Sequence, residues 1–155
     1  MNIDPHLKQI LGLNTVSQIG IVVRDMETAI RNYSDIFGII FTKVFIPEYF
    51  NKIYRGKPGD FRFKVASGMM GELQIELIEV LEGQTIYGEF LEKKGEGLHH
   101  LGFDVENMDE RIEALERLGI SVLQSGERVG VRWAYMDTEK LVGVIFELLQ
   151  REKNI

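Results

Sequence analysis

The chain has 155 residues, of which 45% are hydrophobic, enough for one domain of ordinary size with a real core. A formal net charge of −6 and the lack of a long basic run argue against nucleic acid as a partner. Cysteine is absent, which excludes a disulfide framework, a thiol nucleophile and a thiolate metal site.

The first half of the chain predicts the order β-α-β-β-β. The apolar, β-branched run at 16–23 is typical of a strand buried on both faces. Asp25 is a good N-cap for the following helix, in which apolar residues recur at helical spacing until Gly38 ends it. Further strands are predicted at 39–46, 62–67 and 73–80, and the stretch 47–60, with its glycines, prolines and tyrosines, is interpreted as a long connection.

The second half predicts the same order of elements after a short linking helix at 84–94. Its own helix opens at Asn107, where Glu110 completes a capping-box-like start, and Gly119 ends it. Its strands are predicted at 98–105, 120–123, 131–136 and 144–149, with a hairpin-like break at 126–130. We therefore expect one α+β domain, 1–155, in which two tandem βαβββ modules, at about 16–80 and 98–150, form a curled mixed sheet around a central cleft.

The two halves also repeat residue by residue. Gln18 aligns with His100 and Gly20 with Gly102, and the same offset matches Val23, Met26 and Ile30 with Val105, Met108 and Ile112. Further on, the run 75–78 matches 146–149, which aligns Glu76 with Glu147. Each half therefore carries one polar residue at the start of a strand and one glutamate inside a later strand.

These four polar residues, Gln18, Glu76, His100 and Glu147, are candidate metal ligands. A glutamate between apolar neighbours is costly to bury unless it is paired or bound to a metal. Glycine inside a strand marks a bend or a close approach, so two curled half-sheets would bring these side chains into one pocket. His99 faces the other side of its strand and is expected to be structural.

The chemistry of this set suits one divalent ion. Two carboxylates, an imidazole and an amide oxygen favour Co, Ni, Zn, Mn or Fe. On an octahedral ion, two positions would stay open for a substrate with two oxygens. Glu147 or Glu76 would then remove the proton α to a carbonyl, as the catalytic base.

A loose basic cluster stands out in this acidic protein. It consists of Lys52, Arg55, Lys57, Arg62 and Lys64. One interpretation is a solvated loop. The other is an electrostatic grip on the phosphates of coenzyme A, with the last four residues as the binding set.

The stretch 95–105, Gly-Glu-Gly-Leu-His-His-Leu-Gly-Phe-Asp-Val, resembles methylmalonyl-CoA epimerases, as do the runs 137–140 and 143–149. The repeated module order resembles the vicinal oxygen chelate superfamily, which includes glyoxalase I, extradiol dioxygenases and bleomycin-resistance proteins. The resemblance covers residues 16–150. It implies metal ligands at Gln18, Glu76, His100 and Glu147, and a homodimer.

Two departures from the family pattern bear on function. Epimerases usually have histidine at the position of Gln18, and they carry a second glutamate base on the strand before Glu76, where 61–67 has no carboxylate. Glutamine at the first position resembles some glyoxalase I enzymes. The polar residues that hold glutathione in those enzymes are replaced here by Val22 and Val80.

The resemblance therefore leaves three functions open. The first is a metal-dependent isomerase or epimerase acting on an acyl thioester such as a coenzyme A thioester. The second is a glyoxalase I-like lyase that uses another thiol, and the third is a metal-free protein that binds a small molecule. An extradiol dioxygenase is disfavoured because its iron site needs histidine where Gln18 stands.

The N-terminal residues lack the basic and apolar regions of a signal peptide. No apolar run approaches the roughly 20 residues of a membrane span. We therefore expect a soluble, cytoplasmic protein whose partner is a small molecule, with neither a membrane nor a nucleic acid involved.

Overall fold

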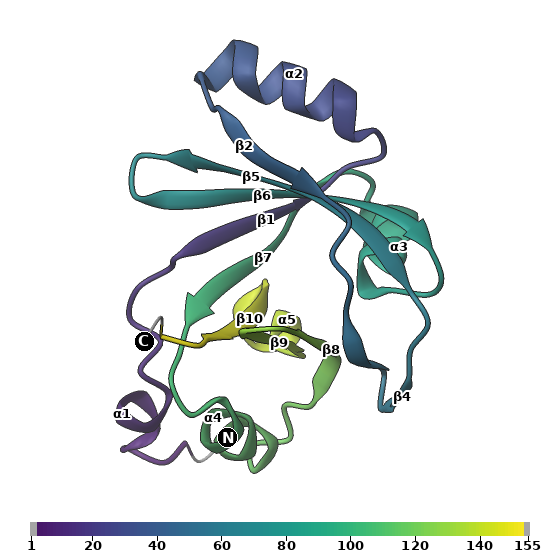
Figure 1. Ribbon diagram of the computed structural model, residues 1–155. Helices are drawn as coiled ribbons and strands as arrows, with labels where there is room; N and C mark the ends of the chain where they lie inside the picture. The colour runs from purple at the N-terminus through teal and green to yellow at the C-terminus, as the bar shows by residue number, and fades with distance from the viewer. Residues whose placement is uncertain (1–2, 154–155) are drawn as a thin grey trace.

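Ten strands form one curled mixed sheet, in the order β2-β5-β6-β1-β7-β10-β9-β8-β3-β4 (Figure 1). The computed structural model describes residues 3–153. The first module supplies β1 (Gln18–Val22), β2 (Phe41–Phe45), β5 (Arg62–Met70) and β6 (Leu73–Glu82). The second supplies β7 (Gly97–Asp104), β8 (Val122–Arg128), β9 (Val131–Met136) and β10 (Ile145–Arg151). The α+β class and the curled mixed sheet predicted from the sequence are confirmed.

The two modules join at the centre of the sheet. There β1 pairs antiparallel with β7, the strand to which it aligns in the repeat. On the outer sides, β1 pairs in parallel with β6, and β7 pairs in parallel with β10. The strands that carry the repeated motifs are therefore four consecutive neighbours, β6-β1-β7-β10.

The stretch 47–60 was predicted to be a connection, and this is wrong. It forms β3 (Phe50–Tyr54) and β4 (Lys57–Pro58), and β3 pairs antiparallel with β8 of the other module. Figure 1 shows this segment running from β2 across to the edge beyond β8. Aromatic and β-branched residues favour a strand here. The nearby glycines and prolines are typical of loops, and the prediction gave them more weight. Asn51 and Arg55 supply the bends, with φ of 49° and 48°.

The break predicted at 126–130 is also wrong in extent. β8 continues to Arg128, and the turn is limited to Val129 and Gly130. Gly126 lies within the strand, where an added Cβ would sit 2.6 Å from Cζ2 of Trp133. This glycine therefore makes room for the indole ring, and it does not mark a turn.

The predicted helices are present as α2 (Met26–Phe37), α3 (Ile86–Lys94) and α4 (Met108–Glu116). Two short helices, α1 (Leu7–Leu11) and α5 (Glu139–Val142), were not predicted, because one or two turns carry too little periodicity. α2 and α4 lie at opposite ends of the molecule in Figure 1. Each packs against its own module, through apolar clusters that include Met26 and Met108. No helix in the described part of the chain is long and apolar enough to cross a membrane.

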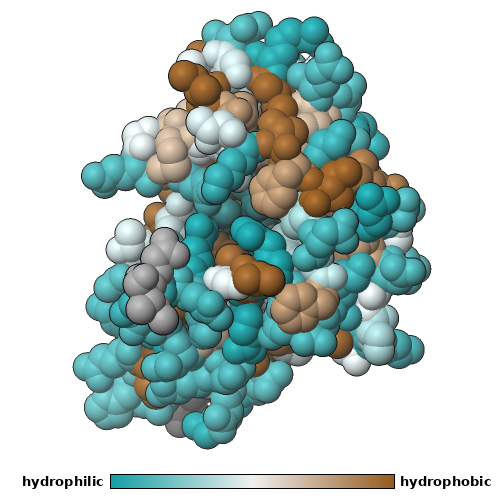
Figure 2. Space-filling view, in the orientation of Figure 1, coloured by the Kyte–Doolittle hydropathy of each residue, from teal (hydrophilic) through white to brown (hydrophobic). Residues whose placement is uncertain are grey.

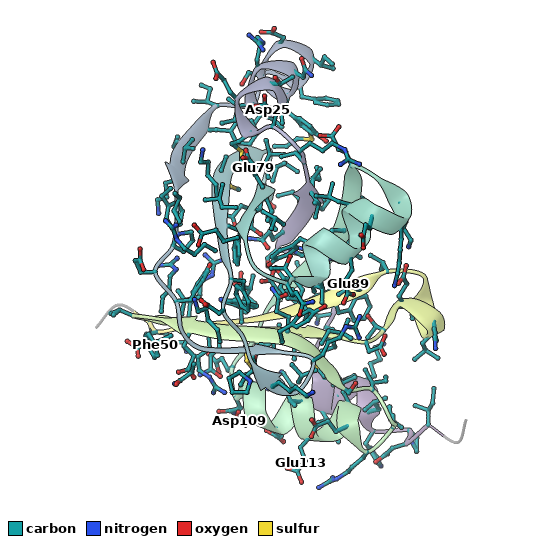
Figure 3. The ribbon with its side chains drawn as sticks, turned by 90° about the vertical axis from the view of Figure 1, so that its right-hand side faces the viewer. Asp25, Phe50, Glu79, Glu89, Asp109 and Glu113 are labelled. Atoms are coloured by element: carbon teal, nitrogen blue, oxygen red, sulfur yellow. The ribbon has the colours of Figure 1, made fainter. Side chains whose placement is uncertain are left out.

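The N-termini of α2 and α4 are held in the same way in both modules. Glu79 accepts a hydrogen bond from the amide of Met26 at 2.6 Å, beside Asp25 at the start of α2 (Figure 3). Gln150 accepts one from the amide of Met108 at 2.7 Å. Each acceptor stands three residues after the repeated glutamate, so the duplication extends to the way each helix is tied to its sheet.

Candidate metal centre

Each of the four central strands contributes one of the predicted ligands. Glu76 lies on β6, Gln18 on β1, His100 on β7 and Glu147 on β10. In the register of the sheet, Gly20 lies opposite both Glu76 and His100. Its repeat partner Gly102 lies opposite both Gln18 and Glu147. The pseudo-twofold arrangement thus places a residue without a side chain between each pair of ligands.

The two glycines are required by this crowding. A Cβ added at Gly20 would stand 1.8 Å from the ring of His100. One added at Gly102 would stand 3.0 Å from Cβ of Gln18 and 3.3 Å from Oε2 of Glu147. Both glycines therefore allow the close approach expected of glycine inside a strand.

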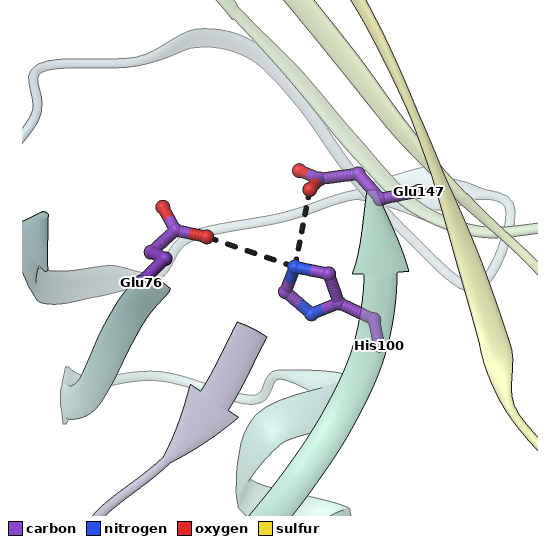
Figure 4. Close-up of side chains that lie close together, drawn as sticks. All are labelled: Glu76, His100 and Glu147. Carbon is purple, nitrogen blue, oxygen red and sulfur yellow. Dashed lines mark ion pairs between the residues drawn. The ribbon is translucent and has the colours of Figure 1, made fainter. Parts of the chain in front are cut away.

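Polar atoms of the other three predicted ligands lie close to Nε2 of His100. That atom is 3.1 Å from Oε2 of Glu147 and 3.6 Å from Oε2 of Glu76 (Figure 4). It is also 3.3 Å from Oε1 of Gln18. A divalent ion binds such atoms at about 2.0–2.2 Å, so neighbouring ligands of one ion lie about 3 Å apart. The separations fit one ion.

Burial makes this cluster of acceptors unstable without a positive charge. His100 is fully buried and Glu147 is 4% exposed. Burial disfavours the charged imidazole, but attraction and hydrogen bonding from Glu147 and Glu76 outweigh it and raise the pKa of His100 to about 9. Burial also raises the pKa of Glu147, against the pull of His100. The site therefore holds a proton where it could hold a metal ion.

The side-chain amide of Gln18 fits the site in two orientations. With Oε1 turned inward, Nε2 donates to Oε1 of Gln74 at 3.0 Å and Oε1 lies 3.3 Å from Nε2 of His100. With the amide reversed, its nitrogen lies 2.8 Å from Glu147 and 3.1 Å from Glu76 and donates to both carboxylates. The inward oxygen is the orientation in which Gln18 could bind a cation, whereas the inward nitrogen satisfies the carboxylates without one.

The cluster lies in the wall of a cleft of about 450 Å³, a size typical of small-molecule sites. Figure 2 shows hydrophilic and hydrophobic residues next to each other in the middle of the face seen in Figure 1. Gln18, Glu76 and Glu147 line it. Its apolar surface includes Phe45, Tyr49 and Trp133. Burial raises the pKa of the Tyr49 phenol, so this ring stays neutral at physiological pH.

Three cations line the cleft, and none belongs to the predicted basic cluster. They are Lys43 on β2, Arg128 on β8 and Arg151 on β10. Val131 pairs with both arginines, so these two residues lie in one row across β8, β9 and β10. The row was not predicted, because Arg128 was assigned to the break at 126–130 and not to a strand.

The four predicted coenzyme A-binding residues do not line this cleft. Arg55 forms an ion pair with Glu89 of α3 at 2.5 Å, and Arg62 forms one with Glu82 at 3.1 Å. Lys57 is exposed on β4 and Lys64 is half-buried on β5. Their role in binding coenzyme A stays a prediction, without support from their positions.

Comparison with known proteins identifies the family of the chain. The family model described as the glyoxalase/bleomycin resistance protein/dioxygenase superfamily matches residues 17–135. A curated relative from Bacillus subtilis (strain 168), the uncharacterized protein YqjC, is 27% identical over 141 residues, which cover 89% of this chain and 93% of the relative.

Among solved structures, the hypothetical protein BH1468 from Bacillus halodurans C-125 has a TM-score of 0.68 at 22% identity, covering 91% of this chain and 96% of that one. Methylmalonyl-CoA epimerase from Mycobacterium tuberculosis has a TM-score of 0.66 at 22% identity, covering 91% and 90%. A methylmalonyl-CoA epimerase in complex with methylmalonyl-CoA and NH4+ has a TM-score of 0.66 at 21% identity, covering 90% and 95%.

At these identities the structural likeness shows a shared fold. The family match covers most of the chain, including the strands that carry Gln18, Glu76 and His100. This chain belongs to the glyoxalase/bleomycin resistance protein/dioxygenase superfamily.

Proposed function

We propose that the protein is a divalent-metal-dependent isomerase or epimerase that removes the proton α to the carbonyl of an acyl thioester. The observation that carries this proposal is the convergence of an amide, an imidazole and two carboxylates on one point beside a cleft of about 450 Å³. The fold shared with methylmalonyl-CoA epimerases supports the choice of an acyl thioester.

Gln18, Glu76, His100 and Glu147 would hold the ion. The donor set contains oxygen and imidazole nitrogen, which suits Co, Ni, Zn or Mn. When bound, such an ion supplies Lewis-acid polarisation of the substrate carbonyl and offsets the negative charge that develops during deprotonation.

Glu147 has the properties of a general base. Its carboxylate is almost fully buried yet borders the cleft. Since it borders the cleft, this carboxylate can reach a proton on a substrate bound there. It is therefore suited both to removing a proton from carbon and to returning it.

Glu76 offers a second base on the other side of the site. β6 and β10 flank the central pair β1 and β7, so Glu76 and Glu147 approach His100 from different sides (Figure 4). Epimerisation requires proton removal on one face of the α-carbon and return on the other. This pair meets that need without a carboxylate on β5, where Ser67 lines the cleft.

The cations of the cleft favour an anionic substrate. In the described part of the chain, neither Lys43 nor Arg128 has an ion-pair partner, whereas Arg151 is paired with Asp104 at 3.1 Å. Two free cations in an acidic protein suit a carboxylate or phosphate on the substrate. An acyl-coenzyme A carries such groups.

The test is exchange of the α-proton of acyl-CoA substrates with solvent deuterium. We expect exchange by the metal-loaded protein and at least about a 100-fold loss in Glu147→Gln, the usual scale of general-base catalysis. The control is Glu72→Gln, since Glu72 is exposed on the β5–β6 turn. Full exchange by Glu147→Gln, or none by the wild type with any acyl-CoA, would contradict the proposal.

A glyoxalase I-like lyase is the second candidate, and the amide ligand Gln18 favours it. An assay with methylglyoxal and a series of thiols distinguishes the two enzymes. A metal-free binding protein is the third candidate, and it predicts no bound metal after purification without chelators.

The homodimer also stays a prediction, which light scattering of the purified protein checks.

A further inference from the structure

His99 stands next to a predicted metal ligand and is itself buried. Only 2% of its surface is exposed, although histidine is an ionisable residue. Its ring lies among three aromatic rings, those of Tyr87, Phe90 and Tyr135, at centroid distances of 5.2, 5.2 and 5.8 Å. Burial among these rings disfavours a charged imidazolium much more than a neutral ring.

The closest polar contact between the two histidines joins their Nδ1 atoms. Nδ1 of His99 lies 3.0 Å from Nδ1 of His100, and the two rings are nearly perpendicular, at 86°. At this distance one nitrogen donates a hydrogen and the other accepts it. Two lone pairs facing each other inside the protein would leave both unsatisfied.

Nε2 of His100 is the atom that faces Glu76 and Glu147, so an ion held there would leave the ring hydrogen of His100 on Nδ1, as the donor. Nε2 of His99 has no hydrogen-bond partner among residues 3–153. A neutral imidazole carries one hydrogen, and placing it on Nε2 leaves the Nδ1 lone pair of His99 free to accept.

We propose that His99 is a positioning residue whose Nδ1 accepts a hydrogen bond from Nδ1 of His100 and thereby directs Nε2 of His100 at Glu76 and Glu147. This inference rests on the metal role of His100 proposed above. Ligand histidines in metalloproteins commonly donate their second N–H to a carboxylate, a carbonyl or water. Here a neutral imidazole takes that place, held by its aromatic neighbours.

The first test compares two substitutions of His99 by Co2+ titration of the purified, metal-free chain. His99→Asn keeps an oxygen acceptor near the position of Nδ1, whereas His99→Leu removes the acceptor and keeps an apolar side chain. We expect about 10- to 100-fold weaker Co2+ binding in His99→Leu, the usual scale for an outer-shell partner, and near-wild-type binding in His99→Asn. Wild-type affinity in His99→Leu, or equal losses in both variants, would overturn the inference.

The second test observes the hydrogen bond directly and does not depend on metal. In metal-free, 15N-labelled protein, a scalar coupling between the two Nδ1 nitrogens is expected, with the proton bonded to His100. Absence of this coupling, or a proton bonded to Nδ1 of His99, would overturn the inference. If the wild type binds no Co2+, the proposed function fails, and the coupling still decides the role of His99.

Discussion

The two strand glycines are the residues on which the site depends most directly. Gly20 and Gly102 each stand between two predicted ligands in the register of the sheet. They leave the space in which an imidazole, an amide and two carboxylates meet. The ligands could be chosen from the repeat, but the role of each glycine became clear only from its neighbours.

Gly20→Ala is expected to remove metal binding and to destabilise the fold. The added Cβ would lie 1.8 Å from the ring of His100, which is fully buried. Overpacking of this kind costs about 1–3 kcal/mol or more. The measurements are chemical denaturation and Co2+ titration.

Gly88→Ala is the matched control for that substitution. Gly88 lies in α3, where an added Cβ would meet only Oγ1 of Thr85, at 3.5 Å. Alanine in a helix is favoured over glycine by about 0.5–1 kcal/mol, so this variant should be slightly more stable. If both substitutions had the same effect, crowding around His100 would not be the cause.

Metal affinity is expected to rise with pH. The pKa of His100 is raised from 6.5 to about 9, so below about 9 the ion must displace a proton from the imidazole. Release of one proton predicts about a tenfold gain in affinity per pH unit between about 6.5 and 9. Titrations with Co2+ at several pH values measure the slope, and an affinity independent of pH would contradict this prediction.

The metal-free protein should show the opposite trend in stability. A folded-state pKa above the ordinary value means that protonated His100 stabilises the fold. That contribution is complete below about pH 6.5 and is lost as the pH rises through about 9. Denaturation curves of chelator-treated protein at pH 6.5 and 9 check it, with His100→Gln as the variant that should lose the dependence.

At the scale of elements, the duplication governs how the helices are attached. The last strand of each module carries both a predicted ligand and, three residues later, the acceptor for the first helical amide of that module. β6 and β10 therefore connect the proposed metal site to α2 and α4.

Glu79→Ala and Gln150→Ala should lower stability by similar amounts. Each removes the acceptor of a helix N-terminal amide, a loss of about 1 kcal/mol on the scale of helix caps. Glu82→Ala is the control, because its ion pair with Arg62 is exposed and contributes little. Thermal unfolding of the three variants tests this, and a loss in Glu82→Ala equal to the other two would contradict it.

Substrate binding should depend on the cleft cations contributed by β2 and β8. We expect Lys43→Gln and Arg128→Gln to raise KM for an acyl-CoA about tenfold each, with a smaller effect on kcat, because they would bind an anionic group remote from the reacting carbon. Arg62→Gln, outside the cleft, is the control. A larger effect from Arg62→Gln would indicate that the predicted basic cluster, and not the cleft cations, binds the substrate.

At the scale of the whole molecule, the repeat made both the fold class and the central strands predictable. Glu76 and Glu147 were identified because each half carries a glutamate in the same apolar setting. The long-range pairing of β3 with β8 could not be predicted, because the local pattern of residues in a strand does not identify the strand with which it pairs. Arg128 was missed because the full extent of β8 was not predicted. Lys43 lies on β2, a strand that was predicted, but its place beside the cleft depends on long-range packing.

Binding of one divalent ion by Gln18, Glu76, His100 and Glu147 is the property from which the proposed function follows. Elemental analysis of protein purified without chelators, followed by Co2+ or Ni2+ titration of the stripped protein, tests it most directly. We predict about one ion per chain, a raised melting temperature on reloading, and loss of both in His100→Gln. Protein that carries no metal, and whose melting temperature does not respond to added Co2+ or Ni2+, would contradict the claim.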